Sequence, residues 1–210
     1  MTDHYFTPLP QSEHKPARLA FSYRGHALVF DTDSGVFSRL QVDKGSELLL
    51  HCLPETMQGN VLDLGCGYGA IGLSVCKAYP ACKVTLADIN ERAVALAKAN
   101  AQTNGLQVQT LVSDGFTALM DRRFDFILLN PPIRAGKQVI YGMFDQAPQQ
   151  LTPEGELWLV IRKQQGAPSA MEHLQGLFKQ VQAIEKKGGY WILRCRSFQD
   201  KEGRMNSHGL

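Results

Sequence analysis

The order of apolar and polar residues divides the chain into two parts. Residues 17–30 alternate in polarity around Arg24 and Gly25, and this period of two predicts a β-hairpin. Residues 33–45 form a polar loop, and residues 44–52 then have the pattern of a short amphipathic helix capped at or near Asp43. We expect residues 1–55 to form an extension packed on the remainder of the chain.

From residue 60 onwards, short apolar runs alternate with helical patterns. Such alternation is typical of a parallel sheet with right-handed crossovers. The predicted strands cover residues 60–64, 83–88, 107–112, 124–130, 156–162, 181–186 and 190–196, and the predicted helices cover residues 70–79, 91–104, part of 117–121, 139–151 and 168–178. The last two strands are joined by KKGGY and should form a hairpin. Residues 56–210 are therefore expected to be an α/β domain with a mostly parallel seven-stranded sheet, helices on both faces and an antiparallel last strand.

The charge balance gives little indication of a partner by itself. A formal net charge of +2 does not suggest a surface that coats nucleic acid, so any such contact has to come from local clusters. Two basic clusters are present: Lys186, Lys187, Arg194, Arg196, Lys201 and Arg204 in the first, and Lys15, Arg18, Arg24 and Arg39 in the second. Ordinary solvated surface explains each cluster about as well when it is taken alone.

The cysteines and the apolar runs bear on the compartment. The five cysteines are odd in number, lack a CxxC pair and mostly fall in apolar segments, which predicts reduced structural thiols rather than disulfides or a metal site. No apolar run approaches the roughly 18 residues that span a bilayer, and the N-terminus lacks an export signal. We expect a cytoplasmic protein without metal or membrane contact.

The segment VLDLGCGYGAIG, residues 61–72, is an apolar strand followed by a glycine-rich turn and the start of a helix. Glycines allow a tight turn and a close approach of a ligand to free backbone N–H groups. Gly67, Gly69 and Gly72 also match the G-x-G-x-x-G of dinucleotide-binding proteins, so the loop alone is weak evidence. Asp63 stands before the glycines, where its carboxylate would meet a positively charged amine.

Two further acids follow the next two predicted strands. Asp88 stands at the tip of the second strand, 21 residues after Gly67, where it would accept hydrogen bonds from ribose hydroxyls. Asp114 follows the third strand and would accept from an adenine amino group. Helix capping explains Asp114 alone almost as well, but it does not readily explain acids at three successive strand tips. Binding of NAD by an oxidoreductase also requires the strand-two acid and stays open at this point.

The fourth strand of the predicted sheet ends in Asn130, Pro131 and Pro132. In an open α/β sheet, ligands bind beyond the carboxyl ends of the strands near the switch in strand order. An exocyclic amino nitrogen is a poor nucleophile because its lone pair is delocalised into the ring. The side-chain oxygen of Asn130 and the backbone oxygen of Pro131 would accept both amino hydrogens, and the fixed φ of proline would aim the second oxygen. This chemistry requires no catalytic histidine.

These motifs together resemble a known family. The glycine loop with Asp63, Asp88 and Asp114 resembles the S-adenosylmethionine site of class I, Rossmann-like methyltransferases. NPPI resembles the Asn-Pro-Pro-aromatic signature of methyltransferases that act on amino groups. With HYF near the start, DSGVFS at 33–38 and VDKGSELLL at 42–50, the chain resembles the RsmC/RlmG-type ribosomal RNA guanine-N2 methyltransferases over about residues 4–196.

The resemblance implies S-adenosylmethionine as cofactor, ribosomal RNA or the small ribosomal subunit as partner, and guanine N2 in 16S ribosomal RNA as target. It implies that Asn130 and Pro131 hold the target amine, stiffened by Pro132. The residues expected at the cofactor are Asp63, Gly65, Cys66, Gly67, Gly69, Asp88, Ile89, Asp114, Gly115 and Asn130.

Ile133 departs from the family pattern because most amino methyltransferases carry an aromatic residue there. Its presence weakens adenine N6 and protein glutamine as targets, although both stay open. Another ring is then needed to stack on a base, and Phe37 is the candidate, with Tyr5 or Phe6 as substitutes, although core packing explains each of them. The same segment, Phe37 with Ser38, is interpreted as a lid.

Ile133, Arg134 and Lys137 complete the expected substrate side. The two basic residues would hold substrate phosphates, although surface solvation explains either of them equally well. The best-known bacterial members of the family have two tandem methyltransferase-like halves, and this chain has the length of the catalytic half. A homodimer that restores the missing RNA-binding surface is therefore a hypothesis. A cofactor-binding protein without methyl transfer remains the alternative of a different class.

Overall fold

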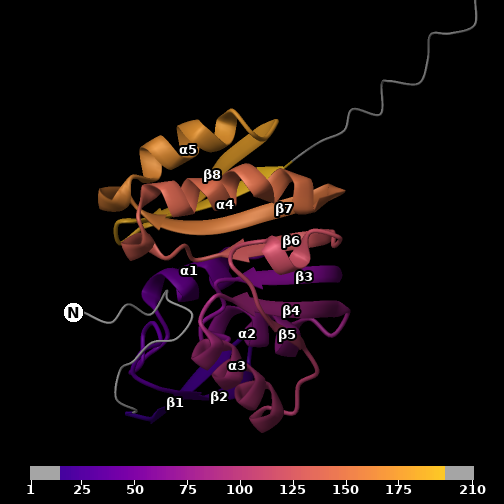
Figure 1. Cartoon of the computed structure of the whole chain (residues 1–210), viewed down its shortest axis with the longest axis vertical. Helices are drawn as coiled ribbons and strands as arrows, with labels where there is room; N and C mark the ends of the chain where they lie inside the picture. Colours follow the sequence, from indigo (N-terminus) through magenta and orange to yellow (C-terminus); the bar gives the residue numbers. More distant parts are fainter. Residues whose placement is uncertain (1–14, 197–210) are drawn as a thin grey trace, which may run out of the picture.

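The expected alternation of strands and helices is present in the computed structural model, which describes residues 15–196 (Figure 1). The strands are β1 (Ala17–Tyr23), β2 (His26–Thr32), β3 (Gly59–Leu64), β4 (Cys82–Asp88), β5 (Gln109–Val112), β6 (Phe124–Leu129), β7 (Leu151–Arg162), β8 (Gln180–Lys187) and β9 (Tyr190–Arg196). The helices are α1 (Lys44–Cys52), α2 (Ala70–Ala78), α3 (Glu91–Thr103), α4 (Lys137–Gln150) and α5 (Ala167–Gln175), with short 3₁₀ turns η1 (Thr117–Leu119), η2 (Ile133–Ala135) and η3 (Lys163–Gln165).

The main sheet has seven strands in the order β5-β4-β3-β6-β7-β9-β8. β9 runs antiparallel to both of its neighbours, and the other pairs are parallel. The chain builds outward from β3 in one direction and from β6 in the other, so the switch in strand order lies between β3 and β6. The predicted α/β, Rossmann-like fold class is confirmed, including the antiparallel last strand and the separate β1–β2 hairpin.

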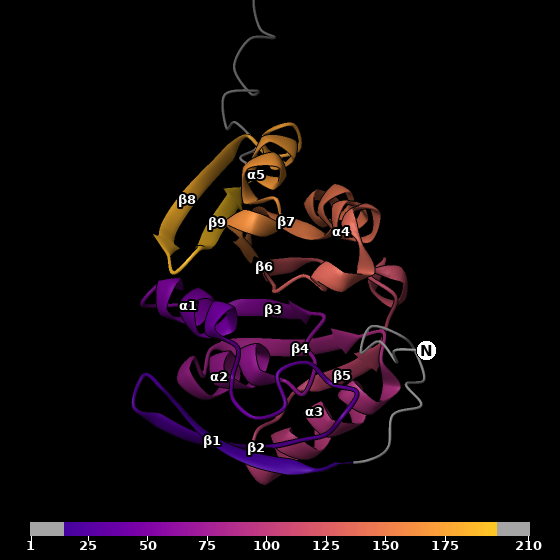
Figure 2. The same cartoon turned by 90° about the vertical axis from the view of Figure 1, so that its left-hand side faces the viewer.

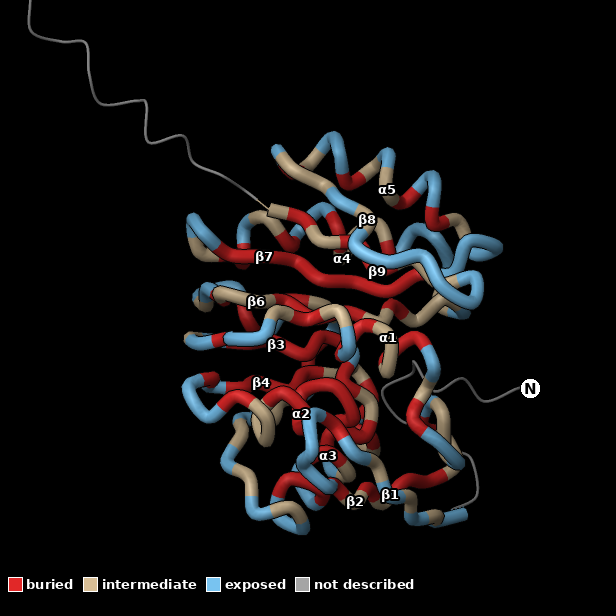
Figure 3. The backbone as a smooth tube through the Cα atoms, turned by 180° about the vertical axis from the view of Figure 1, so that it is seen from behind, coloured by how far each residue is buried: buried red, intermediate tan, exposed pale blue. Residues whose placement is uncertain are grey.

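The central strands are apolar without alternation because both of their faces are covered. Val61 and Leu62 are adjacent in β3 but belong to different apolar clusters. One cluster joins the sheet to α1, α2, α3 and the hairpin, and the other joins it to α4 and α5. The layers are visible in Figure 2, and Figure 3 shows the central strands as buried along most of their length.

The β1–β2 hairpin is attached to α3 through two asparagine side chains. Asn104 accepts from the Val29 N–H at 3.0 Å and donates to the Val29 carbonyl at 2.7 Å. Asn100 does the same with Asp31, at 2.7 and 2.9 Å. Each amide therefore pairs with a strand residue as a neighbouring strand would. The proposed division of the chain at residues 55 and 56 stays a prediction.

Element boundaries differ from expectation mainly at two places. The helix predicted to end at residue 151 ends at Gln150, and β7 begins immediately at Leu151 instead of residue 156. Leu151 pairs with Phe124 and Glu156 with Phe126, so the intervening residues bulge out of the ladder and obscure the strand pattern. β6 ends at Leu129, so Asn130 follows the strand rather than closing it.

The two rings considered as substitutes for Phe37, Tyr5 and Phe6, lie outside the described residues, as do Lys201 and Arg204 of the first basic cluster.

Within residues 15–196, no helix is long and apolar enough to cross a membrane. No cluster of three or more His, Cys, Asp or Glu side chains in that range is arranged to hold a metal ion.

Candidate active site

A cavity of about 520 Å³ lies at the carboxyl ends of the parallel strands, beside the switch between β3 and β6. This volume is within the usual range for small-molecule sites. Most predicted site residues line it: Gly65, Cys66, Gly67, Asp88, Ile89, Asp114, Gly115, Asn130, Pro131, Pro132, Ile133, Arg134, Phe37 and Ser38. Asp63, Gly69 and Lys137 are not among the residues that line it.

The glycine loop presents its backbone to this cavity. Gly65 and Gly67 have φ values of +70° and +55°, which side chains rarely tolerate. A Cβ atom built on either glycine would meet no atom within 4 Å, so there is open space beside the loop. The loop is anchored from behind because the N–H groups of Gly65 and Cys66 both donate to the Ala87 carbonyl, at 2.8 and 3.0 Å.

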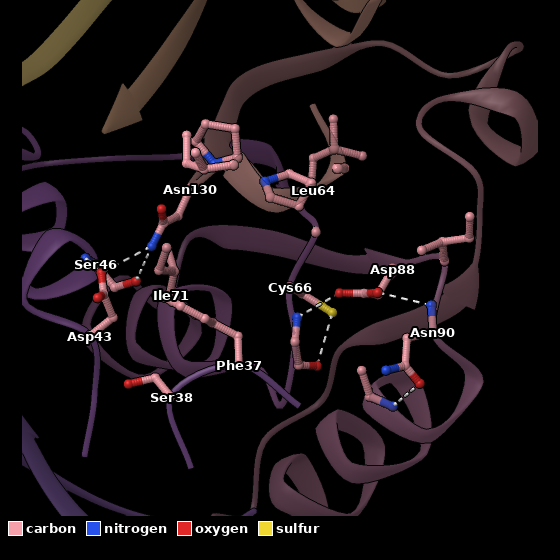
Figure 4. A pocket seen from close by; sticks show the side chains of 18 of the residues that line it. Phe37, Ser38, Asp43, Ser46, Leu64, Cys66, Ile71, Asp88, Asn90 and Asn130 are labelled. Carbon is pink, nitrogen blue, oxygen red and sulfur yellow. Dashed lines mark hydrogen bonds between the residues drawn. The ribbon is translucent and has the colours of Figure 1, made fainter. Parts of the chain in front are cut away.

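Asp88 fastens the glycine loop to the start of α3. One carboxylate oxygen accepts from the Gly67 N–H at 2.8 Å and the other accepts from the Asn90 N–H at 2.9 Å (Figure 4). Burial raises the pKa of Asp88, and the hydrogen bonds from backbone N–H groups oppose that shift. The carboxylate lines the cavity at the tip of β4, as the sequence predicted for a ribose ligand, although the ligand role itself stays a prediction.

Asp63 lies beneath the loop rather than in the cavity wall. It is 1% exposed, and its Oδ2 accepts from the Gly72 N–H at 2.8 Å. Burial, chiefly, raises the pKa of Asp63 to about 7. A Cβ at position 72 would lie 2.2 Å from Leu86 Cδ2 and 3.0 Å from the Asp63 carboxylate, so a glycine lets α2 pack this closely on the sheet. Direct contact between Asp63 and a cofactor amine stays a prediction, and its visible role is to hold the first turn of α2.

The end of the segment of residues 33–38, Val36 to Ser38, lines the cavity from the side of α3. The Asn90 side chain donates to the Gly35 carbonyl at 2.9 Å, and Arg92 donates to the Ser34 carbonyl at 3.0 Å. These bonds hold the segment beside Asp88. Phe37 is 41% exposed at this place, and Ser38 has a φ of +58°. The predicted lid is therefore anchored on the β4 side of the cavity.

Asn130 is held in one orientation by α1. Its Nδ2 donates to Ser46 Oγ at 2.9 Å and to Asp43 Oδ2 at 3.2 Å (Figure 4). A carboxylate oxygen can only accept, so the amide nitrogen has to face α1 and the amide oxygen has to face away. The oxygen is thereby left to accept a hydrogen bond from a ligand.

The sequence indicated only part of the role of Asp43. The carboxylate caps α1 as expected, accepting from the N–H groups of Gly45 at 2.8 Å and Ser46 at 3.1 Å. Its further contact with Asn130 spans 87 residues of sequence, and no local pattern indicates such a pair. Ser46 was missed for the same reason. Both residues line the cavity.

The far wall of the cavity contains two residues that the sequence analysis also missed. Arg162 ends β7 and Tyr190 begins β9, and the two are paired in the ladder. The guanidinium of Arg162 donates to the Tyr190 hydroxyl and lies over the Tyr190 ring, 4.6 Å from its centroid. The antiparallel direction of the last strand could have indicated Tyr190. An antiparallel strand begins where its parallel neighbours end, so its first residue lies beside their carboxyl ends.

The basic clusters are largely engaged within the protein. Arg194 and Arg196 both bind the buried carboxylate of Glu156, and Arg18 pairs with Asp31. Arg24 donates to the backbone carbonyls of residues 53–55. Of the two basic residues predicted at the substrate, Arg134 is exposed at the cavity, whereas the Lys137 ammonium lies over the Tyr141 ring.

Comparison with known proteins is consistent with this geometry. The model of the family described as "Methyltransferase small domain" matches residues 27–194. The chain belongs to that family. Its sequence and fold are of the RsmC type within the class I methyltransferases, as the resemblance implied. Membership favours methyl transfer over the nicotinamide chemistry that the glycine loop alone left open.

Three relatives describe how far the similarity extends. The uncharacterized protein YbxB of Bacillus subtilis (strain 168) is 42% identical over 199 residues, covering 93% of this chain and 99% of the relative. Ribosomal RNA small subunit methyltransferase C of Psychromonas ingrahamii is 40% identical over 169 residues, covering 77% of this chain and 46% of the relative. The structure of the T. thermophilus 16S rRNA N2 G1207 methyltransferase (RsmC), in complex with AdoMet and guanosine, matches with a TM-score of 0.78 at 29% identity. The match covers 89% of this chain and 51% of that chain. The chain thus spans about half the length of these two methyltransferases.

Proposed function

We propose that the protein transfers a methyl group from S-adenosylmethionine to the exocyclic N2 of a guanine in ribosomal RNA, within the small-subunit 16S RNA. The observation that carries the proposal is the fixed amide of Asn130. Its nitrogen is committed to Asp43 and Ser46, and its oxygen is available in the same cavity as the glycine loop and Asp88.

The residues on the β4 side fit the cofactor. The loop of Gly65 and Gly67 has open space for a ligand beside its backbone. Asp88 is placed for ribose hydroxyls, and Asp114 with Gly115 follows β5 at the position proposed for adenine. When bound, S-adenosylmethionine supplies a sulfonium methyl group that is open to nucleophilic attack.

The residues after β6 fit a planar amino group. The Asn130 side-chain oxygen and the Pro131 carbonyl would each accept one N–H of the target, which orients the nitrogen lone pair toward the methyl carbon. As the N–C bond forms, the C–S bond breaks and the nitrogen releases one proton to water. The protein's contribution is positioning and electrostatic stabilisation, so a strong base is not needed.

The nature of the target rests on the relatives. Both of the methyltransferases described above are named for ribosomal RNA, and the structure from T. thermophilus contains guanosine. Ile133 at the cavity, in place of an aromatic residue, sets the chain apart from the pattern of most adenine and glutamine enzymes. Ribosomal RNA as the substrate places the proposed activity in the cytoplasm. A homodimer remains a prediction that a measurement of solution mass would test.

The test is methylation of ribosomal RNA, or of small subunits, taken from a strain that lacks the gene. With labelled S-adenosylmethionine, nucleoside mass spectrometry should show N2-methylguanosine. Label in N6-methyladenosine or in a protein glutamine would contradict the guanine proposal. Calorimetric binding of NAD without binding of S-adenosylmethionine would remove the whole methyl-transfer proposal.

Asn130→Ala ties this activity to the site. Loss of the oriented oxygen should reduce the rate constant for methyl transfer by at least about 100-fold. The dissociation constant for S-adenosylmethionine should change less than about threefold. Asn60→Ala is the matched control because Asn60 is exposed near the start of β3, at the amino ends of the parallel strands and away from the cavity. It should retain wild-type activity.

A further inference from the structure

The ends of β7 and β8, next to Tyr190 at the start of β9, carry exposed cations. Arg162 ends β7, Lys163 begins η3, and Lys186 and Lys187 end β8. The Lys163 N–H donates to the Gly189 carbonyl at 2.7 Å, which ties the two segments together. We call these four residues, together with Tyr190, the target-side platform.

The platform is continuous with the active site. Arg162 and Tyr190 line the cavity that also contains Asn130. A Cβ on Gly45 would lie 2.9 Å from the Tyr190 ring, so that ring packs directly against the first turn of α1. The same turn provides Ser46, which orients Asn130. Figures 1 and 2 both show the β8–β9 turn beside α1.

The charge of the platform is not consumed within the protein. Among residues 15–196, none of its four cations forms an ion pair with a carboxylate within 4.0 Å. Arg194 and Arg196, farther along the same hairpin, instead share an ion pair with the carboxylate of Glu156. Two of the platform cations instead lie over rings: Arg162 over Tyr190, and Lys186 over Trp191 at 3.7 Å.

We propose that the target-side platform binds the RNA strand that delivers the target guanosine. In this arrangement Lys163, Lys186 and Lys187 contact backbone phosphates. The Arg162 guanidinium, which covers the Tyr190 ring in the free protein, moves to a phosphate, and the ring then stacks on a base at or next to the target. Lysine and arginine neutralise phosphates, and aromatic rings provide the stacking surface on which single-stranded RNA is usually held. The inference rests on the proposed function, which supplies RNA as the substrate.

The phosphate contacts are tested with Lys163→Gln/Lys186→Gln/Lys187→Gln. The control is Lys83→Gln/Lys98→Gln/Arg123→Gln, which removes the same charge at exposed positions that do not line the cavity. Anisotropy of a labelled guanine-containing single-stranded RNA is measured over a series of salt concentrations. The platform variant should bind about 10-fold more weakly at moderate salt, and the slope of log Kd against log salt should fall by about 2. The control should match the wild type.

The stacking contact is tested at Tyr190. Tyr190→Leu should raise the KM for RNA about fivefold or more, whereas Tyr190→Phe keeps the ring and should stay near the wild-type value. Neither variant should alter the dissociation constant for S-adenosylmethionine. A drop in affinity for the cofactor that equals the loss for RNA would instead mean that Tyr190 only supports the fold of the site.

The outcomes separate this inference from the proposed function. RNA binding through the platform without methyl transfer to RNA would leave the platform standing and overturn the function. Methyl transfer to RNA by the wild type, with the KM for RNA and the salt slope unchanged in the platform variant, would support the function and overturn the platform. Equal losses in the platform and control variants, or no RNA binding by the wild type at low salt, would also overturn the platform.

Discussion

The two sides of the cavity differ in charge and in the way they are fixed. On the β4–β5 side, acids stand at the strand tips: Asp88 and Asp114 line the cavity, and Asp63 lies beneath the loop. On the β6–β7 side, the wall carries the Asn130 amide and two arginines, Arg134 and Arg162, and the acid of this wall, Asp43, accepts hydrogen bonds from Asn130 and from the first turn of α1. A cofactor with hydroxyl and amine donors suits the first side, and a polyanionic strand suits the second.

The difference in anchoring is just as informative. The glycine loop and acids of the cofactor side are held by contacts between neighbouring strand ends, such as Asp88 to the Gly67 N–H, whereas the segment of residues 33–38 reaches this side from the N-terminal part of the chain. The target side is held by α1, which belongs to the N-terminal part of the chain and reaches across to Asn130. Local motifs can encode the first arrangement, whereas only the complete fold creates the second. Variants that affect one side and spare the other test this distinction.

The largest expected effect among these variants is on the cofactor side. Asp88→Ala removes an acceptor for ribose hydroxyls and also releases the Gly67 N–H. The dissociation constant for S-adenosylmethionine should rise about 100-fold, because hydrogen bonds to a charged group are among the stronger ones. RNA affinity, measured by anisotropy, should not change. An equal loss of RNA affinity would show that the two sides are not separable.

A smaller effect is expected where α1 supports Asn130. Ser46→Ala and Asp43→Ser each remove one acceptor of the amide, and serine at position 43 retains helix capping. Each should lower kcat about 10-fold without changing the dissociation constant for S-adenosylmethionine, because the amide would spend part of its time flipped. Asp43→Asn keeps an oxygen acceptor and should recover most of the activity. If all three variants lose thermal stability and kcat falls in proportion to that loss, the two residues have a merely structural role.

A weaker effect is expected for a substitution at Phe37. The measurement decides whether the segment of residues 33–38 serves the cofactor or the target. Hydrogen bonds from Asn90 and Arg92 hold this segment next to Asp88. Phe37→Ala should therefore raise the dissociation constant for S-adenosylmethionine about threefold, a typical value for an aromatic contact. If only the KM for RNA rises, the sequence-based prediction that this ring stacks on the target base gains support.

Asp63→Asn should affect stability more than methyl transfer. The pKa of Asp63 is raised to about 7 in the folded protein, compared with its ordinary value of 3.8. The unfolded chain therefore loses this proton at lower pH than the folded chain does, and the free energy of unfolding decreases as the pH rises from about 4 to about 7. The variant should melt a few degrees above the wild type at pH 8 and at the same temperature near pH 4. Calorimetric melts of the cofactor-free protein provide the measurement. A strong loss of S-adenosylmethionine affinity in this variant would support direct contact with the cofactor instead.

The sequence predicted the parts of the fold that depend on local pattern. The glycine loop, the acids at the strand tips and the Asn-Pro-Pro motif all follow apolar strands, and parallel strands bring their ends to one edge. The order of the elements was therefore enough to bring Asp88, Asp114 and Asn130 to one cavity. The antiparallel last strand was predicted because the link KKGGY is too short for a crossover.

The features that the sequence did not reveal depend on contacts across the fold. Asp43 has the pattern of a simple N-cap, and its second role requires Asn130 to arrive from a distant strand. Arg194 and Arg196 look like a basic surface until Glu156 is placed between them. β7 was predicted too short because its bulge breaks the apolar pattern. For Asp43 and the two arginines the physical cause is a partner that is remote in sequence, and for β7 it is an irregularity within the strand.

The pairing of Asn100 and Asn104 with β2 has a consequence for association between molecules. Four residues of helix rise about 6 Å, nearly the length of two residues of strand, so the two amides match Val29 and Asp31 in spacing. The outer edge of the two-stranded hairpin is thereby occupied by helix side chains at those two residues. The β2 edge closed in this way cannot recruit a strand from another copy at those two residues.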